Sequence, residues 1–511
     1  MQIPTITVDQ SRLELADIVA IARTSAHIAL SDDATFRTAI SRGADFLDRL
    51  LAEDGTIYGV TTGYGDSCTV VVPAELIAEL PQHLYTYHGC GLGAHFNAEQ
   101  TRAILAVRLV SLCKGYSGVS VGLLEQITRL LQHDILPLIP SEGSVGASGD
   151  LTPLSYLAAV LCGEREVLYQ GRVMSAAQAL QKAGISPLTL RPKEGLAIMN
   201  GTAVMTALAC LAYDRAAYLM RLCTRITAMA SLALDGNPQH FDATLFSVKP
   251  HAGMQQVASW LRQDLHCQPT ERNGKRLQDR YSIRCAPHVI GVLADALPLF
   301  HDFIANELNS VNDNPIIDAE GEHVLHGGHF YGGHIAFAMD SMKNTVANLA
   351  DLLDRQMALL VDTRYNHDLP ANLSGAQGSR AAINHGLKAL QISASAWTAE
   401  ALKLTMPASV FSRSTECHNQ DKVSMGTIAA RDCLRVLELT EQVVAALLIT
   451  VRQGVELRCR GNPETPLQQS LQLMQQLLCE DIPPIIEDRR LEPDLRLLLD
   501  RIRQQYWVLY D

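Results

Sequence analysis

Long helical stretches are the feature of this sequence that most constrains its fold. Apolar residues recur at helical spacing over five stretches of about twenty residues or more. Such helices bury their apolar stripes most readily against one another, so the pattern predicts a helical bundle. The expected helices are 97–114, 203–234, 286–309, 341–362 and 425–457. The stripe is clearest in 341–362, where it consists of Met342, Val346, Leu349, Leu353, Met357 and Leu360.

Strand signals are few and short. They cover Ile3–Val8, Val71–Val72 and Val167–Tyr169. Strand and helix do not alternate regularly, which argues against a doubly wound sheet. The sequence therefore predicts a mainly α protein with few short strands. Glycine and proline cluster between the long helices, in loops where chemistry is most easily placed.

Composition excludes several classes of protein. The 511 residues include 42 Lys+Arg and 54 Asp+Glu, a net charge of −12, which argues against a nucleic-acid or anionic-membrane partner. With 47% hydrophobic and 19% charged residues, the chain is folded and buries much surface within itself or between subunits. Length alone would allow about three domains.

Twelve cysteines are scattered without a C-x-x-C pair, as in proteins of a reducing compartment. The first residues carry no basic segment that leads into an apolar one, so we expect a cytoplasmic protein. One run, Gly195–Tyr213, contains no charged residue, but its Asn and Thr residues favour a core segment over a membrane span.

The densest motif is the glycine-rich run Gly143–Leu154, which contains Ala147-Ser148-Gly149. A phosphate-binding loop would need Lys after its last glycine, whereas Asp150 follows Gly149 here and would repel a phosphate. Glycine content alone fits an ordinary tight turn equally well. The run Gly143–Leu154 can therefore be interpreted only together with other motifs of the sequence.

Further motifs follow in order along the chain. They are Ile57–Gly65 (IYGVTTGYG), Ile198–Thr202 (IMNGT), Gln278–Cys285 (QDRYSIRC), Asn309–Pro315 (NSVNDNP), His326–Phe330 (HGGHF) and Glu416–Gly426 (ECHNQDKVSMG). Together with Ala147-Ser148-Gly149 they resemble the histidine, phenylalanine and tyrosine ammonia-lyase family over nearly the whole chain. Each motif alone has a simpler interpretation: a packed Tyr in a turn, an Asn helix cap, a surface Arg ion pair.

The resemblance implies a built-in cofactor. In that family an internal Ala-Ser-Gly cyclises to 4-methylideneimidazol-5-one (MIO) with loss of two waters, which assigns Ala147, Ser148 and Gly149 to that role and implies no external cofactor. The residue types suit the reaction, since Gly149 lacks a Cβ beside its nitrogen and Ser148 has a hydroxyl to eliminate. Ammonia elimination needs an electrophile that ordinary side chains do not supply.

The resemblance also assigns roles to the other motifs. It implies that the site includes a base on a mobile loop (Tyr58), partners of the cofactor ring (Asn200 and Tyr281), a carboxylate clamp (Arg284), an aromatic wall (Phe330), a residue near the substrate amine (Glu416) and a further substrate contact (Gln278). Asn309–Pro315 is expected to support the site structurally.

Three positions bear on the substrate. Tyr87-His88 occupies the family's ring-selectivity pair, and Gln420 stands where histidine enzymes have Glu. An imidazole can bond a phenol, and a site built for a substrate hydroxyl rejects the analogue without it by about 10⁴–10⁵. We therefore expect tyrosine, or another hydroxylated aromatic L-amino acid, to give a trans-arylacrylate such as p-coumarate. Alternatives are phenylalanine, then histidine, or an aromatic 2,3-aminomutase with the same cofactor.

His329 departs from the family's usual H-G-G-N-F motif. His326, His329 and His334 could in principle bind a metal, but their spacing matches no standard site and we expect none. A metal-binding or sensory bundle, or an inactive family member, would leave the ordered motifs unexplained.

The resemblance finally implies the long-helix bundle of the ammonia-lyase (fumarase/aspartase-like) type. The expected regions are 1–205, with the Tyr58 loop and Ala147-Ser148-Gly149, and 206–511, with the bundle, joined by one composite active site. A homotetramer is implied, with sites built from more than one chain and with the apolar faces of 341–362 and 425–457 largely between subunits. The only other partner expected is the small amino acid substrate.

Overall fold

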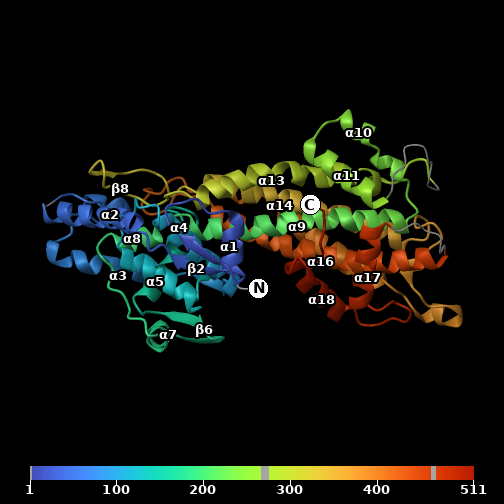
Figure 1. Cartoon of the computed structure of the whole chain (residues 1–511), viewed down its shortest axis with the longest axis horizontal. Helices are drawn as coiled ribbons and strands as arrows, with labels where there is room; N and C mark the ends of the chain where they lie inside the picture. The colour runs from blue at the N-terminus through green and yellow to red at the C-terminus, as the bar shows by residue number, and fades with distance from the viewer. Residues whose placement is uncertain (1–2, 54, 266–275, 462–467, 511) are drawn as a thin grey trace. The chain divides into compact units, whose positions relative to one another are not determined.

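A computed structural model describes residues 3–53, 55–265, 276–461 and 468–510. The protein is mainly α, with short strands, as the sequence predicts (Figure 1). The chain forms two compact units, each built from three segments. The first unit consists of residues 1–214, 301–340 and 407–431, and the second of residues 215–300, 341–406 and 432–511. The predicted division at residue 205 stays a prediction.

Four long helices contribute residues to both units. They are α9 (Ala203–Ala233), α13 (Ala286–Leu308), α14 (Gly333–Val361) and α16 (Gly426–Gly461), which confirms four of the predicted helices (Figure 1). Polar contacts join three of them within the second unit. Arg215 of α9 binds Glu441 of α16 at 2.8 Å, and the side chains of Thr227 in α9 and Gln356 in α14 are hydrogen-bonded at 3.0 Å. These are the contacts of a helical bundle.

The apolar stripe of α14 is buried within the chain. Its six predicted members have no exposed surface: Met342, Val346, Leu349, Leu353, Met357 and Leu360. The same is true of much of α16, including Val436, Leu437, Val443, Val444 and Leu448. The expectation that these faces lie largely between subunits is therefore wrong. Packing against other helices of the same chain covers each apolar stripe.

Shorter helices complete the first unit. Asn97 begins α4 (Ala98–Leu112) as predicted, because its side chain accepts from the N–H of Gln100 while the Gln100 side chain accepts from the N–H of Asn97. The other helices are α1 (Leu15–Ala22), α2 (Ala34–Ala52), α3 (Leu80–Tyr87), α5 (Val121–Gln132), α6 (Leu151–Leu161), α7 (Ala176–Ala183) and α8 (Glu194–Met199).

The described strands form small, separate sheets. Parallel β1 (Thr5–Val8) and β2 (His27–Leu30) pair in the register Thr5↔His27. The antiparallel pairs are β3 (Leu92–His95) with β5 (Pro140–Glu142), β4 (Leu136–Pro137) with β6 (Glu166–Tyr169), β6 with β7 (Arg172–Ser175), and β8 (Ile316–Asp318) with β9 (His323–Leu325). Strands at 3–8 and 167–169 are thus confirmed. The strand at 71–72 is wrong, since Val71 makes only an isolated bridge with Thr62.

The second unit adds α10 (Ala243–Ser247), α11 (Ala252–Leu265), α12 (Tyr281–Arg284), α15 (Lys388–Lys403), α17 (Gln469–Asp481) and α18 (Glu492–Arg503). Within the described ranges, the helical stretch Tyr281–Leu308 is long and apolar enough to span a membrane by length and composition alone. The core helix of a soluble protein passes the same test, so this is weak evidence. The uncharged run Gly195–Tyr213 is interrupted between α8 and α9.

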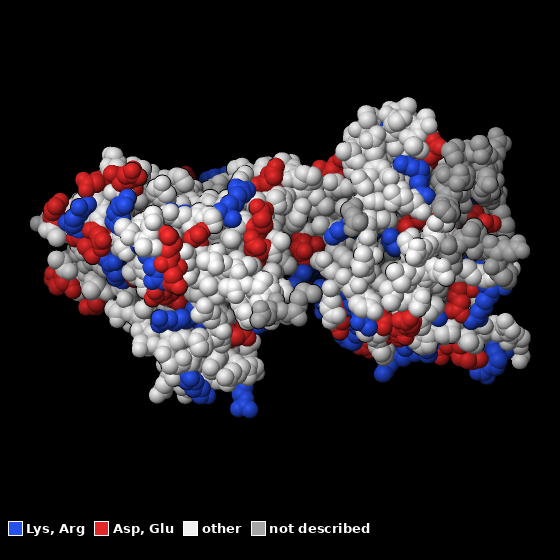
Figure 2. All heavy atoms as spheres, in the orientation of Figure 1, with Lys and Arg blue, Asp and Glu red and all other residues white. Residues whose placement is uncertain are grey.

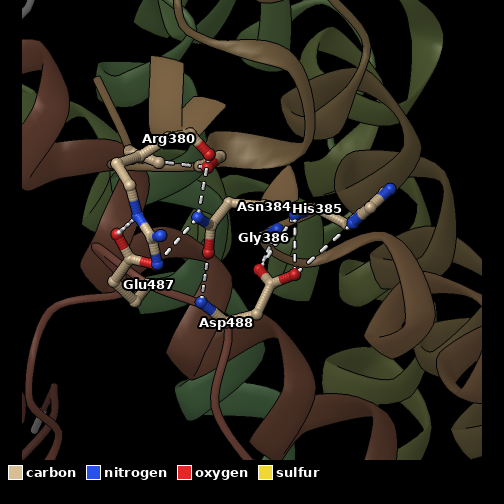
Figure 3. A network of polar contacts seen from close by, with 8 residues as sticks. Arg380, Asn384, His385, Gly386, Glu487 and Asp488 are labelled. Carbon is tan, nitrogen blue, oxygen red and sulfur yellow. Dashed lines mark hydrogen bonds and ion pairs between the residues drawn. The ribbon is translucent and has the colours of Figure 1, made fainter. Parts of the chain in front are cut away.

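Acidic and basic side chains are interspersed over the face shown in Figure 2. One exposed polar network in the second unit joins two loops (Figure 3). Arg380 binds the Glu487 carboxylate through Nε at 3.0 Å and Nη2 at 2.6 Å, and the backbone N–H groups of His385 and Gly386 donate to Asp488. Asn384 bridges both acidic residues, because its Nδ2 donates to Glu487 and its Oδ1 accepts from the N–H of Asp488.

This network predicts local opening at low pH. Hydrogen bonds from Arg380 and Asn384 lower the pKa of Glu487 from 4.5 to about 2, so its stabilisation is complete above 4.5 and is lost as the pH falls towards 2. The backbone N–H of Asp488 donates to Asn384, which binds Glu487, so its amide hydrogen exchange should show a protection factor that falls in that window. The variant Glu487→Gln should be less protected at neutral pH and should change less between pH 4.5 and 2. Equal pH dependence in both proteins would contradict the assignment.

Candidate active site

The first unit contains a cavity of about 1000 Å³. It gathers most of the residues that the motifs predicted, although they are spread over more than half of the chain. Its lining includes Tyr58, Tyr87, His88, Ala147, Ser148, Gly149, Asn200, Phe330, Glu416 and Gln420. The motifs therefore converge on one place, and that place is the candidate active site.

Gln278, Tyr281 and Arg284 belong to the second unit and are absent from this lining. They do lie together, and for Tyr281 and Arg284 their spacing on a helix predicted this. The Arg284 guanidinium lies 4.6 Å from the centre of the Tyr281 ring, and its Nη2 is 3.4 Å from Oε1 of Gln278. Gln356 of α14 holds this segment by donating to the carbonyl of Ser282 at 2.9 Å. The Tyr281 side chain is 72% exposed.

Contacts with Asn200 and Gly201 hold the Ala147–Gly149 segment. Gly149 pairs with Gly201 in a parallel bridge, and the N–H of Gly201 donates to the Ser148 carbonyl at 3.2 Å. The same carbonyl accepts from Nδ2 of Asn200 at 2.9 Å. Gly149 has φ +73°, and a Cβ there would lie 2.0 Å from the Gly201 carbonyl oxygen, so only glycine fits.

Asp150 anchors this segment from behind. Its buried carboxylate accepts from the N–H groups of Val204 and Met205 at 3.0 Å each, in the first turn of α9. It also accepts from the hydroxyls of Ser144, at 3.1 Å, and Thr427. Burial raises the pKa of Asp150 to about 6, although these hydrogen bonds favour the charged form. From the sequence alone, Asp150 was informative only as an argument against a phosphate-binding loop.

A buried polar cluster supports the turn between α8 and α9. Arg108 donates to the carbonyl of Ala197 at 2.7 Å and to Oδ1 of Asn312 at 2.9 Å. Lys193 and Asp313 form a buried ion pair at 2.5 Å. Asn312 and Asp313 belong to the NSVNDNP motif, which therefore lies where a structural support of Asn200 is needed.

Tyr58 lies in the glycine-rich loop at the cavity. Its phenolic oxygen accepts from the N–H of Gly65 at 2.7 Å. Burial raises the pKa of Tyr58, the Gly65 hydrogen bond opposes that rise, and the charge of Glu416 adds to it. Tyr58 is therefore a neutral phenol here, and it needs added positive potential before it can act as a base.

Tyr87 and His88 lie at the end of α3, with ring centres 4.3 Å apart. Nδ1 of His88 lies 2.9 Å from the Leu84 carbonyl, so this nitrogen carries the hydrogen and Nε2 keeps its lone pair. Burial lowers the pKa of His88, which favours this neutral ring. His88 can accordingly accept a hydrogen bond from a donor in the cavity.

Gln420 and Glu416 come from one tight turn. Thr415 and Gln420 pair across it, while Glu416, Cys417 and His418 all have left-handed backbone conformations. Nε2 of Gln420 donates to the Ser148 hydroxyl at 3.3 Å, and its Oε1 accepts from the Thr415 hydroxyl at 3.0 Å. The side chain at 420 is thus a neutral amide fixed against Ser148.

The structure adds lining residues that no motif role covered, among them Tyr64 and Lys422. Both lie within the motifs Ile57–Gly65 and Glu416–Gly426, and this position was the signal by which the sequence could have identified them. His326 lines the cavity and meets the Tyr58 ring edge-on at 6.2 Å, whereas His334 packs against Phe303. Within the described ranges no group of three or more His, Cys, Asp or Glu side chains is placed to hold a metal ion. His329 does not line the cavity.

Comparison with known proteins shows the family of this chain. The family model for aromatic amino acid lyases matches residues 13–477. The chain belongs to the aromatic amino acid lyase family. It is 36% identical to the histidine ammonia-lyase of Bacillus subtilis (strain 168), over 98% of this chain and 97% of that protein. As a member of this family with such relatives, it is a carbon–nitrogen lyase that releases ammonia.

Two solved structures show the same fold for this aromatic amino acid lyase. The histidine ammonia-lyase from Trypanosoma cruzi superposes with a TM-score of 0.89 at 30% identity, covering 98% of this chain and 94% of that one. The tyrosine aminomutase from Streptomyces globisporus gives 0.90 at 31% identity, covering 98% and 97%. The relatives' names do not support tyrosine as the lyase substrate, and they fit the histidine alternative better.

The support of the turn after α8 can be tested at Gly201. A Cβ there would lie 2.1 Å from the Arg108 guanidinium and 2.3 Å from Oδ1 of Asn312. Gly201→Ala should therefore lower the free energy of unfolding by about 3 kcal/mol, measured by denaturant unfolding. Gly171→Ala is the matched control, since Gly171 has positive φ but nothing within 4 Å of its Cβ, and it should cost only about 1 kcal/mol. Equal losses would contradict this account.

Proposed function

We propose that this lyase eliminates ammonia from an aromatic L-amino acid, with MIO formed from Ala147, Ser148 and Gly149. The observation that carries the proposal is the setting of Ser148. It faces the cavity between Asn200, which donates to its carbonyl, and Gln420, which donates to its hydroxyl. The Asn200 donor lies where a developing negative charge on the Ser148 carbonyl would need it, whereas Gln420 contacts the hydroxyl that must be lost.

The residues present fit the cofactor. Gly149 has no Cβ to block its nitrogen, and the left-handed Gly146 and Gly149 bracket the tripeptide in a tight turn. Ser148 carries the hydroxyl that must be lost, and its contact with Gln420 leaves it within the cavity. When formed, the cofactor supplies the electrophile that the side chains lack.

The other residues then have defined tasks. Tyr58 removes the β-proton of the substrate, and Glu416 faces the amine. Phe330 forms part of the wall. We assign the substrate carboxylate to Arg284, with Gln278 as a further substrate contact. Tyr281 remains a partner of the cofactor ring, and all three are supplied by another chain of a homotetramer. A guanidinium holds a carboxylate through two parallel hydrogen bonds.

Two substrates have support of different kinds. The relatives' names favour L-histidine. The site itself favours L-tyrosine, because Gln420 is a neutral amide already bonded to Thr415 and Ser148, and because Nε2 of His88 can accept from a phenol. The likeness to a tyrosine aminomutase supports a 2,3-aminomutase outcome as well. Phenylalanine is a further candidate substrate, but its ring has no polar group that could bond His88.

The cofactor is tested by Ser148→Ala. This variant lacks the hydroxyl to be lost, so it should fold normally and lose at least about 10³-fold in kcat, since the electrophile is missing. Intact mass spectrometry should show the wild type lighter than its encoded mass by two waters, and the variant at its full encoded mass. Undiminished turnover by the variant would overturn the cofactor assignment.

The substrate is tested by following arylacrylate absorbance with tyrosine, phenylalanine, dihydroxyphenylalanine and histidine in parallel. Discrimination through His88 should favour tyrosine over phenylalanine by about 10²-fold or more. Gln420→Glu should raise kcat/KM for histidine relative to that for tyrosine, because histidine enzymes of the family have Glu at this position. The highest kcat/KM with histidine in the wild type would reject tyrosine, and accumulation of β-amino acid with little arylacrylate would identify an aminomutase.

A further inference from the structure

The Glu416 carboxylate makes two hydrogen bonds inside the protein. Oε1 accepts from the backbone N–H of Asp66 at 2.7 Å, across 350 positions of sequence. Oε2 accepts from Nδ2 of Asn419 at 2.9 Å, which fixes the orientation of the carboxylate. A residue expected only to face a substrate amine would need neither bond.

Glu416 binds the peptide group next to the one that holds Tyr58. The N–H of Gly65 donates to the Tyr58 oxygen at 2.7 Å, and the next N–H along the chain, that of Asp66, donates to Glu416. The approach is close, because a Cβ on Gly65 would lie 2.1 Å from Oε1 of Glu416. Glu416 and Tyr58 therefore bind two consecutive peptide groups of the same loop.

The bond also satisfies a group that its own segment leaves unpaired. Asp66 lies in the first turn of the short helix η1 (Gly65–Thr69), and the N-cap residue Tyr64 makes no side-chain capping bond. The first N–H groups of a helix have no acceptor within it. Glu416 supplies the missing acceptor from a distant part of the chain.

The turn that carries Glu416 is strongly constrained. Its three consecutive left-handed residues are disfavoured for side chains with a Cβ, so other bonds must maintain them. Thr415 pairs with Gln420 through two backbone hydrogen bonds, and the Asn419 N–H donates to the Glu416 carbonyl. Gln420 from this turn binds Ser148. One rigid turn thus reaches the Ser148 segment with one side chain and the Tyr58 loop with another.

We propose that Glu416 is a positioning residue that latches the Tyr58 loop, residues 58–66, over the Ser148 segment through the Asp66 N–H. The latch adds to the role of Glu416 at the substrate amine, because a carboxylate has about four acceptor positions and the two bonds leave room for a cation. The kinetic consequence rests on the proposed function, whereas the structural consequence does not.

The structural test is amide hydrogen exchange of residues 59–65 in the resting protein. Asp66→Pro removes the donor and leaves Glu416 intact, and Glu416→Ala removes the acceptor. Each should raise exchange of these amides by about 10- to 100-fold, the range expected for loss of a charged hydrogen bond. Asp66→Ala is the matched control, since it keeps the N–H and should exchange as the wild type does. Glu416→Gln keeps one acceptor oxygen and should fall between.

The kinetic test separates a latch from an amine contact. Asp66→Pro should lower kcat about tenfold or more with little change in KM, while Asp66→Ala keeps the wild-type kcat. The double variant with Glu416→Ala should exchange no faster than either single variant, because both remove the same bond. Thermal unfolding confirms that each variant is folded.

Each result has a defined meaning. Unchanged exchange at residues 59–65 in both Glu416→Ala and Asp66→Pro overturns the latch, even if Glu416→Ala loses activity. Raised exchange with kcat unchanged in Asp66→Pro also overturns it, because the loop position would then not matter for turnover. If both variants show raised exchange but the wild-type protein turns over no amino acid, the latch is supported and the proposed function is refuted.

Discussion

The site depends on one buried carboxylate. Asp150 directly follows the Ala147–Gly149 segment and accepts hydrogen bonds from the start of α9 and from Thr427 at the start of α16, while α6 begins at the next residue. A charge taken out of water is stable only when its acceptor positions are filled, and here helix N–H groups and hydroxyls fill them. Three helix starts are thereby fixed to the segment on which the chemistry is proposed.

Around that anchor, two residues of the cavity have further support. The Arg108–Asn312 cluster holds the backbone on either side of Asn200, at Ala197 and Thr202, and Gln420 is held by its pairing with Thr415. Tyr58 differs, because its loop is held by hydrogen bonds to two N–H groups and contains several glycines. The site therefore combines firmly held donors with a glycine-rich loop, an arrangement that suits the proton removal proposed for Tyr58.

The sequence was most informative where a signal was local. The Asn97 cap placed the start of α4, and the stripe of α14 identified its buried face, because both depend on residues within a few turns. The helix α14 begins earlier than predicted, at Gly333 rather than at Ser341. Short strands such as β3 and β8 carry too few residues for a pattern. Whether a stripe packs within one chain or between chains cannot be read from periodicity.

The same division holds for the site. Motif order identified the cavity residues from Tyr58 to Gln420, which the structure places together. The contacts of Asp150 with Thr427, or of Glu416 with Asp66, join segments far apart in sequence and leave no local trace. Residue identity at 88 and 420 favoured tyrosine, whereas overall similarity favours histidine. A substrate preference depends on few side chains, and similarity averages over all of them.

The distance between Asp150 and Thr427 has a consequence for synthesis. A ribosome finishes the Ala147–Gly149 segment long before it reaches Thr427, Ser424 and Met425, and the last two make backbone hydrogen bonds with Gly146 and Val145. Until that part of the chain emerges, the nascent loop lacks these partners and has those within residues 200–205. The assembled geometry of this loop is thus available only to a nearly complete polypeptide.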